Sequence, residues 1–218
     1  MIWYQGCNET GDEQEADSYL EKFTQTVTLW REKFGYFPIA TCQINRHAFK
    51  EGDRDRLWGK VREAQRQAAR RIEGVYIVPT IDMHTVDGIH NASGACITVG
   101  ERLANVLLKG HYGLPGTFAP SITKITRVDA RTVHLEFDGR YMLRTMDDIA
   151  TGIHIEDEFG LQKCTKISVC DDGALVTAER DIGENAVFHA YWEREVPAFF
   201  IRDINGMPML ACYGVEIE

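Results

Sequence analysis

The chain has 218 residues, and 44% of them are apolar, which is enough to build one large hydrophobic core or two small ones. Its 33 acidic residues outnumber its 24 basic residues and give a formal net charge of -9, which argues against a nucleic-acid partner because no basic surplus can replace phosphate counterions. No apolar run approaches the roughly 20 residues that cross a bilayer, and no export signal is recognised, so a membrane is not expected as a partner.

The first 110 residues alternate short apolar runs with amphipathic segments. The chain opens with a short strand, "MIW", which ends in the polar turn "YQG". The pattern then predicts a helix over 13–34, a buried strand in "FPIATCQIN", a helix in "LWGKVREAQRQAARRI", a strand in "GVYIVPTID" and a helix in "ASGACITVGERLANVLLKG". This alternation predicts βαβ units and a parallel sheet, with chemistry at the carboxyl ends of the strands, in 5–10, 43–47 and 82–90.

The composition of the sequence changes at "HYGLPGTFAP", where proline and glycine residues cluster. Beyond it, short runs of period-two character, among them "TVHLEF", "KISVC", "ALVTAE", "AVFHAYW" and "AFFIRDI", are separated by turn signals. We therefore expect an α/β part in 1–112, a linker in 113–119 and a β-rich module in 120–218. The six cysteines show no zinc-binding spacing, and we expect most of them to be reduced and buried.

The densest polar cluster is "IDMHTVDGIHN", which follows a predicted strand. A carboxylate three residues before a histidine can hold the imidazole through its Nδ1 proton, so Asp87 would orient His90 as a general base. The same segment also offers Asp82 and His84, and the four side chains together could bind a divalent metal ion, although the spacing is not that of a known metal motif. An ordinary polar loop is the third interpretation.

The opening turn places Gln5 and Gly6 at the end of a strand. A side-chain amide beside a backbone N–H that can be approached closely is what an oxyanion hole requires. An isolated Gln-Gly pair is more commonly an ordinary turn.

The motifs "IWYQGCNE", "WGKVREAQ" and "IDMHTVDGIH" followed by "VGERLAN" resemble, in order and spacing, the sialate O-acetylesterase family of SGNH (GDSL-like) hydrolases. The segment "AVFHAYWEREVPAFFIRDINGMPM" is also similar to the closing β segment of that family. The resemblance implies a three-layer, flavodoxin-like parallel sheet, an acetylated carbohydrate as substrate and no cofactor or metal. It assigns Gln5 and Gly6 to the oxyanion hole, and Asp87 and His90 to a Ser-His-Asp triad.

The sequence departs from the family pattern at the nucleophile. The family serine lies in a GQSN-type block upstream of the oxyanion motif, whereas the serines here are Ser18, Ser93, Ser121 and Ser168, and none has that strand-to-turn context. Ser93 is better explained as a helix N-cap. Cys7 stands where the family usually has a carboxylate, and a thiol near a histidine could act as a substitute nucleophile, but a tolerated variant is the simpler interpretation.

From these departures we expect a fragment or split-gene half of a longer esterase. The sheet would be incomplete at its N-terminal strand, and the Trp3 strand would expose an unpaired edge. An upstream segment or a companion chain would carry the serine, and the chain alone would be nearly inactive. Two alternatives stay open, namely a non-catalytic carbohydrate-binding or interaction module on an esterase scaffold, and a metal-dependent hydrolase built on Asp82, His84, Asp87 and His90.

Overall fold

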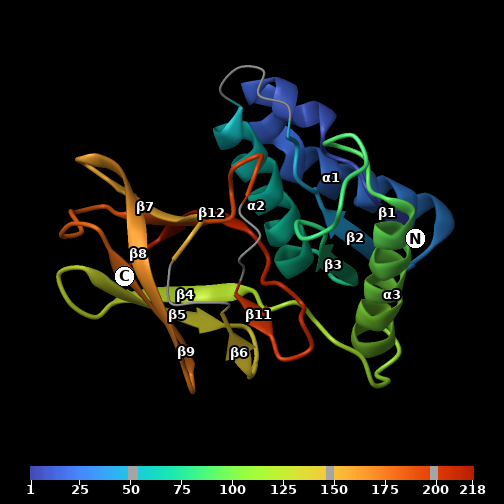
Figure 1. Ribbon diagram of the computed structural model, residues 1–218. Helices are drawn as coiled ribbons and strands as arrows, with labels where there is room; N and C mark the ends of the chain where they lie inside the picture. Colours follow the sequence, from blue (N-terminus) through green and yellow to red (C-terminus); the bar gives the residue numbers. More distant parts are fainter. Residues whose placement is uncertain (49–53, 146–149, 197–200) are drawn as a thin grey trace. The chain divides into compact units, whose positions relative to one another are not determined.

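The computed structural model describes residues 1–48, 54–145, 150–196 and 201–218, which divide into two compact units, Met1–Phe118 and Ala119–Glu218. The fold is mixed α/β, with a three-stranded parallel sheet in unit 1 and a seven-stranded antiparallel sheet in unit 2 (Figure 1). None of the helices in the described ranges has the length and apolar character needed to cross a membrane.

Unit 1 alternates strands and helices as the sequence predicts. Its elements are β1 Ile2–Trp3, the short 3-10 helix η1 Asn8–Gly11, α1 Glu13–Phe34, β2 Ile39–Gln43, α2 Asp55–Arg71, β3 Val75–Pro79 and α3 Ser93–Gly110. The strand order is β1-β2-β3, so β1 lies at an edge, and among the described residues no strand pairs with its other side.

Helix α1 has the bounds that the amphipathic pattern predicts, because signals at both ends agree with it. The Asp12 side chain accepts a hydrogen bond from the Glu15 amide at 3.1 Å and caps the first turn. Gly35 ends the helix with a positive φ of 80°, a conformation that glycine adopts without strain.

The sheet of unit 1 separates two clusters of buried side chains. Ile39 of β2 packs with α1 and α2, whereas Ala40 and Cys42 of the same strand pack with α3. Alternate residues of a strand point to opposite faces, so α1 and α2 cover one face and α3 covers the other (Figure 1). This arrangement leaves the carboxyl ends of the strands, and the loops that follow them, at one edge of the sheet.

Unit 2 is a nearly closed antiparallel sheet with the strand order β12-β10-β7-β8-β9-β5-β4. Arg127 donates to the Glu218 carbonyl at 2.8 Å and Glu218 donates to the Ile125 carbonyl at 2.9 Å, which joins the two ends of the sheet. Strands β6 and β11 form a separate pair. The strands are β4 Ile122–Arg127, β5 Thr132–Phe137, β6 Leu143–Arg144, β7 Ile153–Asp157, β8 Gly160–Cys170, β9 Gly173–Ala178, β10 Val187–Ala190, β11 Arg202–Asp203 and β12 Cys212–Glu216.

The predicted runs of the second half mark β5, β8, β9 and β10. The run "AFFIRDI" lies partly on 197–200, outside the described residues, and β11 is at its end. All six cysteines are free, but Cys42, Cys164 and Cys212 alone are buried, so the expectation that most are core residues holds for half of them.

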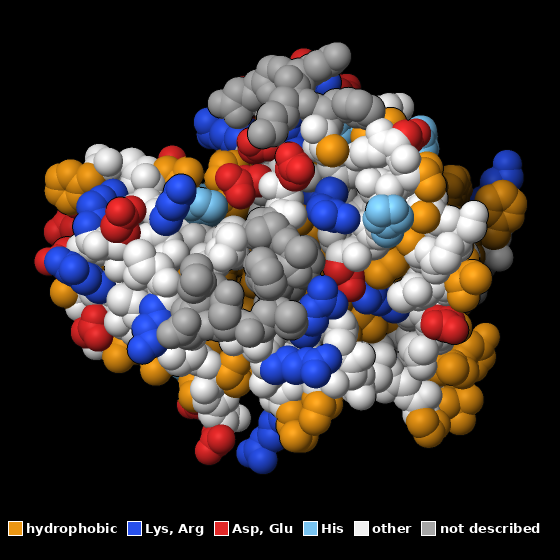
Figure 2. All heavy atoms as spheres, in the orientation of Figure 1, with side chains coloured by type: hydrophobic (Ala, Val, Ile, Leu, Met, Phe, Trp, Pro, Cys, Tyr) orange, Lys and Arg blue, Asp and Glu red, His pale blue; other side chains and the backbone are white. Residues whose placement is uncertain are grey.

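On the face drawn in Figure 2, charged side chains of both signs are mixed. Figure 2 shows acidic and basic side chains interspersed over the described part of the face that it presents. The net charge of -9 is therefore not gathered into one acidic field on that face.

Candidate active site

Two buried polar side chains of α2 hold the carboxyl ends of β1 and β2. Gln65 accepts a hydrogen bond from the Ile44 amide at 2.9 Å and donates to the Gln5 carbonyl at 2.8 Å. Arg62 donates to the Ile44 carbonyl at 3.1 Å and to the Asn45 carbonyl at 2.9 Å. Burial lowers the pKa of the Arg62 guanidinium to about 9, so it stays charged at neutral pH. The helix thus fixes the backbone from which the opening turn begins.

The segment between β3 and α3 folds back on itself as a tight loop. Thr85 and Asn91 form an antiparallel bridge, and the Val86 amide donates to the His90 carbonyl at 2.9 Å. Asp87 therefore lies at the tip of the loop, and His90 lies where the chain returns from it. At the other side of the tip, Gly88 accepts a backbone hydrogen bond from Ala48, which follows β2, at 2.9 Å.

Asp87 and His90 form a hydrogen-bonded pair. The Asp87 Oδ2 atom lies 2.6 Å from His90 Nδ1, while Asp87 Oδ1 accepts the amides of His90 at 2.8 Å and Ile89 at 3.1 Å. The bond from the His90 ring, and then the two amides, hold the pKa of Asp87 well below its usual range, so the carboxylate is ionised. The His90 side chain is 72% exposed, which leaves its outer edge accessible to a substrate.

A polar network joins this loop to the strand ends. Asn91, the residue after His90, donates to Tyr4 Oη at 3.5 Å and accepts from Asn45 Nδ2 at 2.5 Å. Tyr4 Oη in turn lies 3.2 Å from Thr80 Oγ1. Because Tyr4 directly precedes Gln5, the network brings together the two segments that carry the predicted site residues.

Sequence reasoning did not name Tyr4, Asn45, Thr80 or Asn91 as members of the site. A signal was present for Asn45, because 43–47 was expected to contribute chemistry as the carboxyl end of a parallel strand. Tyr4, Thr80 and Asn91 belong to no recognisable sequence motif. Their hydrogen bonds form only because the loop packs against the ends of the strands.

Of the two predicted oxyanion donors in the opening turn, the Gln5 side-chain amide is already hydrogen-bonded. Gln5 Nε2 donates to Glu9 Oε1 at 2.6 Å. Gly6 is buried, has a φ of 133°, and within the described part of the chain its amide donates no hydrogen bond. The Gly6 N–H is therefore available, whereas the Gln5 amide would have to leave Glu9 to bind an oxyanion.

The structure does not assemble the metal cluster of Asp82, His84, Asp87 and His90. Both oxygens of Asp82 bind the Arg102 guanidinium, at 2.7 and 2.8 Å, and this pair is almost buried. A carboxylate neutralised by a fixed arginine is not available as a metal ligand. The alternative of a metal centre at these four residues therefore loses its support, and Asp82 instead anchors the start of the loop to α3.

Within unit 1, neither the serines nor Cys7 show the setting of an activated nucleophile. Ser93 is the first residue of α3, not its N-cap as expected; Ala92 is the N-cap and makes no side-chain capping bond. Ser18 donates to the Gln14 carbonyl within α1, and the two remaining serines belong to unit 2. Desolvation raises the pKa of the Cys7 thiol, so it is protonated at neutral pH and is a poor nucleophile.

Comparison with known proteins gives a family and a fold. A family model described as a carbohydrate esterase, sialic acid-specific acetylesterase, matches residues 1–109. Among solved structures, a carbohydrate acetylesterase from Xanthomonas citri is similar in fold, with a TM-score of 0.82 and 20% identity over 96% of this chain and 49% of that chain. A protein from Arabidopsis thaliana is 27% identical, with a TM-score of 0.42 over 50% of this chain and 42% of that chain.

A search of curated proteins gave no match. The present chain spans about half the length of the acetylesterase whose fold it shares.

Proposed function

Since the chain belongs to the carbohydrate esterase family of sialic acid-specific acetylesterases, we propose that it supplies the His-Asp pair and the oxyanion-binding turn of a carbohydrate O-acetylesterase. The observation that carries the proposal is the 2.6 Å contact between His90 Nδ1 and Asp87 Oδ2 on an exposed loop inside the region matched by the family model. We further propose that unit 1 is the three-layer SGNH arrangement of this family.

In the proposed mechanism a serine hydroxyl attacks the acetyl carbonyl and forms a bond to carbon, while His90 Nε2 takes the hydroxyl proton. The ionised Asp87 holds the imidazole by its Nδ1 proton and stabilises the imidazolium. The amide of Gly6, joined by Gln5 once it turns from Glu9, donates to the oxyanion. His90 then passes the proton to the departing sugar oxygen, and water releases acetate by the same steps.

The serine in this proposal comes from another segment or a companion chain. The basis is the local setting of the four serines present: Ser18 is bonded within a helix, and Ser93 begins α3 beyond the loop. Ser121 is buried, and Ser168 lies within strand β8. The edge of β1, which no described strand covers, is where such a segment would add a strand. The 218 residues alone are then expected to bind but not to turn over an acetyl ester.

The first test measures hydrolysis of 4-nitrophenyl acetate and of an O-acetylated sugar by the purified chain, together with labelling by a fluorophosphonate probe of activated serines. We expect the purified chain to hydrolyse the esters no faster than free imidazole does, and the probe to label no serine. Efficient turnover by the purified chain would contradict the external serine, and its loss in Ser93→Ala or Cys7→Ala would identify an internal nucleophile.

The second test uses the chain joined to a segment that carries a GQSN-type serine block. We expect acetyl ester hydrolysis that falls by about 10⁴-fold in Asp87→Asn and at least as far in His90→Ala, because each change removes a triad member. Gln5→Ala should cost about 10² to 10³-fold, as for loss of one oxyanion donor.

The matched control is His84→Ala, an exposed histidine of the same loop, which should keep the activity. Sugar binding without hydrolysis in the joined protein would instead support the carbohydrate-binding module. Activity that His90→Ala does not change would refute the triad.

A further inference from the structure

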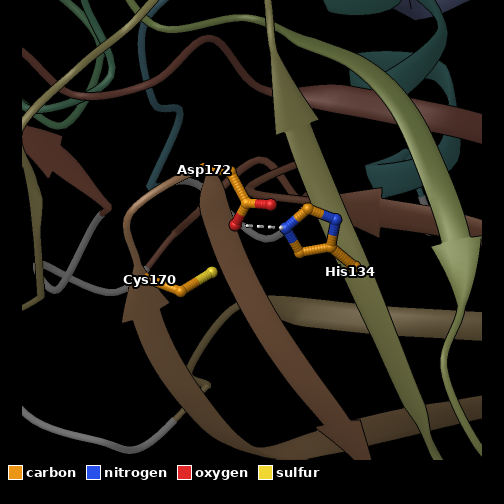
Figure 3. Close-up of side chains that lie close together, drawn as sticks. All are labelled: His134, Cys170 and Asp172. Atoms are coloured by element: carbon orange, nitrogen blue, oxygen red, sulfur yellow. Dashed lines mark hydrogen bonds and ion pairs between the residues drawn. The ribbon is translucent and has the colours of Figure 1, made fainter.

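Unit 2 contains a compact set of metal-ligand side chains that the candidate site of unit 1 does not use. Among the residues that the structure describes, His134, Cys170 and Asp172 form the one group of three or more such side chains whose ligand atoms all lie within 4.8 Å of one another. Figure 3 shows the imidazole of His134 on β5 and the side chains of Cys170 and Asp172, at the turn between β8 and β9, directed toward one another.

Strand pairing holds the backbone around these side chains. Strand β5 pairs with β9, β9 pairs with β8, and Cys170 is paired with Gly173 across the turn. A Cβ atom on Gly173 would lie 2.0 Å from the Leu135 carbonyl oxygen and 3.1 Å from His134 Nε2, so only glycine lets the turn approach β5 this closely. His134 and Cys170 are thus held by strands of the sheet, and Asp172 lies in the tight turn between two of its strands.

The three side chains already interact with one another through hydrogen bonds and charge. His134 Nε2 lies 3.2 Å from Asp172 Oδ1. The Cys170 side chain, followed by the charge of His134, holds the pKa of Asp172 below its usual value, while desolvation and then Asp172 raise the pKa of the Cys170 thiol. Without a bound ion, the Asp172 carboxylate therefore accepts hydrogen bonds from both His134 and Cys170.

A pocket of about 770 Å³ adjoins the cluster. His134 and Asp172 line it together with Glu136, Asp138 and Tyr141. An ion bound to the three side chains would lie at the wall of this pocket, where water or a solute could reach a further coordination position.

We propose that His134 Nε2, Cys170 Sγ and a carboxylate oxygen of Asp172 bind a single Zn²⁺ ion, with water in the fourth position. An imidazole nitrogen, a thiolate and a carboxylate are the donor types of zinc sites, and three protein ligands leave a zinc ion with an open place. Tetrahedral bonds to such donors separate the ligand atoms by roughly 3.3 to 3.8 Å, so the present spacing needs only small side-chain rotations. On binding, Zn²⁺ replaces the thiol proton of Cys170, which passes to solvent.

The test uses Co²⁺ as a spectroscopic substitute for Zn²⁺ on the full chain, reduced and stripped of metal. We expect one equivalent of Co²⁺ to give a thiolate-to-metal charge-transfer band and the intense visible bands of tetrahedral coordination, and Zn²⁺ to remove both. Cys170→Ser should abolish the charge-transfer band. His134→Gln and Asp172→Asn should weaken binding by at least about 10-fold.

Cys96→Ser is the control, because Cys96 is an exposed cysteine of unit 1 that should not affect the spectrum. The Asp172 side chain is 79% exposed, so Asp172→Asn tests ligation in a variant that keeps its fold, as circular dichroism would verify. Absence of the charge-transfer band in the unaltered chain, or its persistence in Cys170→Ser, would overturn the proposal. Neither result bears on the esterase proposal, which concerns unit 1.

Discussion

At the scale of single residues, Gly6 has a structural role that is independent of any oxyanion. Its φ of 133° is a conformation that other residues adopt only with strain, and a Cβ there would lie 2.7 Å from Gln65 Nε2 and 3.1 Å from Val61 Cγ1. Gln65 itself is buried and holds the Gln5 carbonyl, so it cannot simply rotate away. A glycine is therefore required for helix α2 to support the opening turn.

We predict that Gly6→Ala lowers the free energy of unfolding by about 1 to 3 kcal/mol, through backbone strain and the clash with α2. Urea unfolding followed by circular dichroism measures the change. Gly100→Ala is the matched control, since no atom lies within 4 Å of a Cβ at this position in α3, and it should be neutral or stabilising by up to about 1 kcal/mol. Equal unfolding of Gly6→Ala and the unaltered chain would show that the close contact is unimportant.

Single-residue contacts also differ in how far they can be predicted from the sequence. The contact between Asp87 and His90 was predictable because it joins residues three apart, within one loop. The contacts of Asn91 with Asn45 and Tyr4 join residues 46 and 87 positions apart, so they depend on the order of the strands in the sheet. The ion pair between Asp82 and Arg102 was not predicted for the same reason. The sequence therefore could not show that Asp82 is unavailable as a metal ligand.

At the scale of elements, the helices and the buried parallel strands of unit 1 were predicted well because the hydrophobic period agrees with the burial there, and in α1 the caps agree as well. Several antiparallel strands were not. In β4 the burial pattern loses its alternation at the register shift between Ile122 and Lys124, where a bulge breaks the period of two. In β7 the sequence Ile-His-Ile-Glu does alternate, but the run holds only two apolar residues, too few to mark a strand, and His154 is buried together with both of them.

One carboxylate of unit 2 links elements that are distant in the chain. Asp157, at the end of β7, binds the Arg180 guanidinium through both oxygens at 2.7 Å and accepts the amides of Gly183 and Phe159 at 2.9 Å. The guanidinium, and then these amides, hold the pKa of Asp157 well below its usual range. The β7–β8 hairpin is thereby tied to the segment after β9.

We predict that Asp157→Asn lowers the free energy of unfolding by about 2 to 3 kcal/mol at neutral pH, because several charge-assisted hydrogen bonds are lost. The folded-state pKa is lower than the unfolded value of about 3.9, so the stabilisation by Asp157 is complete above that value and is lost as the pH falls below it. Urea unfolding of both proteins between pH 7 and pH 3 should show the difference between them shrinking below about pH 4.

Asp181→Asn is the control for this prediction. The Asp181 side chain is 71% exposed in its pair with Arg131, so its replacement should change the free energy of unfolding by less than about 1 kcal/mol. A difference between Asp157→Asn and the unaltered chain that stays constant down to pH 3 would exclude the carboxylate as its cause.

At the scale of the whole molecule, each unit has a core of its own. In unit 1 the two clusters on either face of the sheet contain residues of that unit only. In unit 2, Val133, Leu135, Ile155, Val176 and Phe188 are fully buried on strands of the antiparallel sheet. Domains with separate cores commonly open as separate cooperative units.

We therefore predict that a destabilising change in one unit increases hydrogen exchange in that unit alone. In mild urea, mass spectrometry should show faster exchange of β2 and β3 amides in Gly6→Ala with the amides of β8 and β9 unchanged, and the reverse in Asp157→Asn. The double variant should show the sum of the two effects, since each altered site belongs to a unit with its own core. Faster exchange of both sets of amides in either single variant would mean that the units unfold as one cooperative body, and the candidate esterase site would then owe its stability to the β-rich half as well.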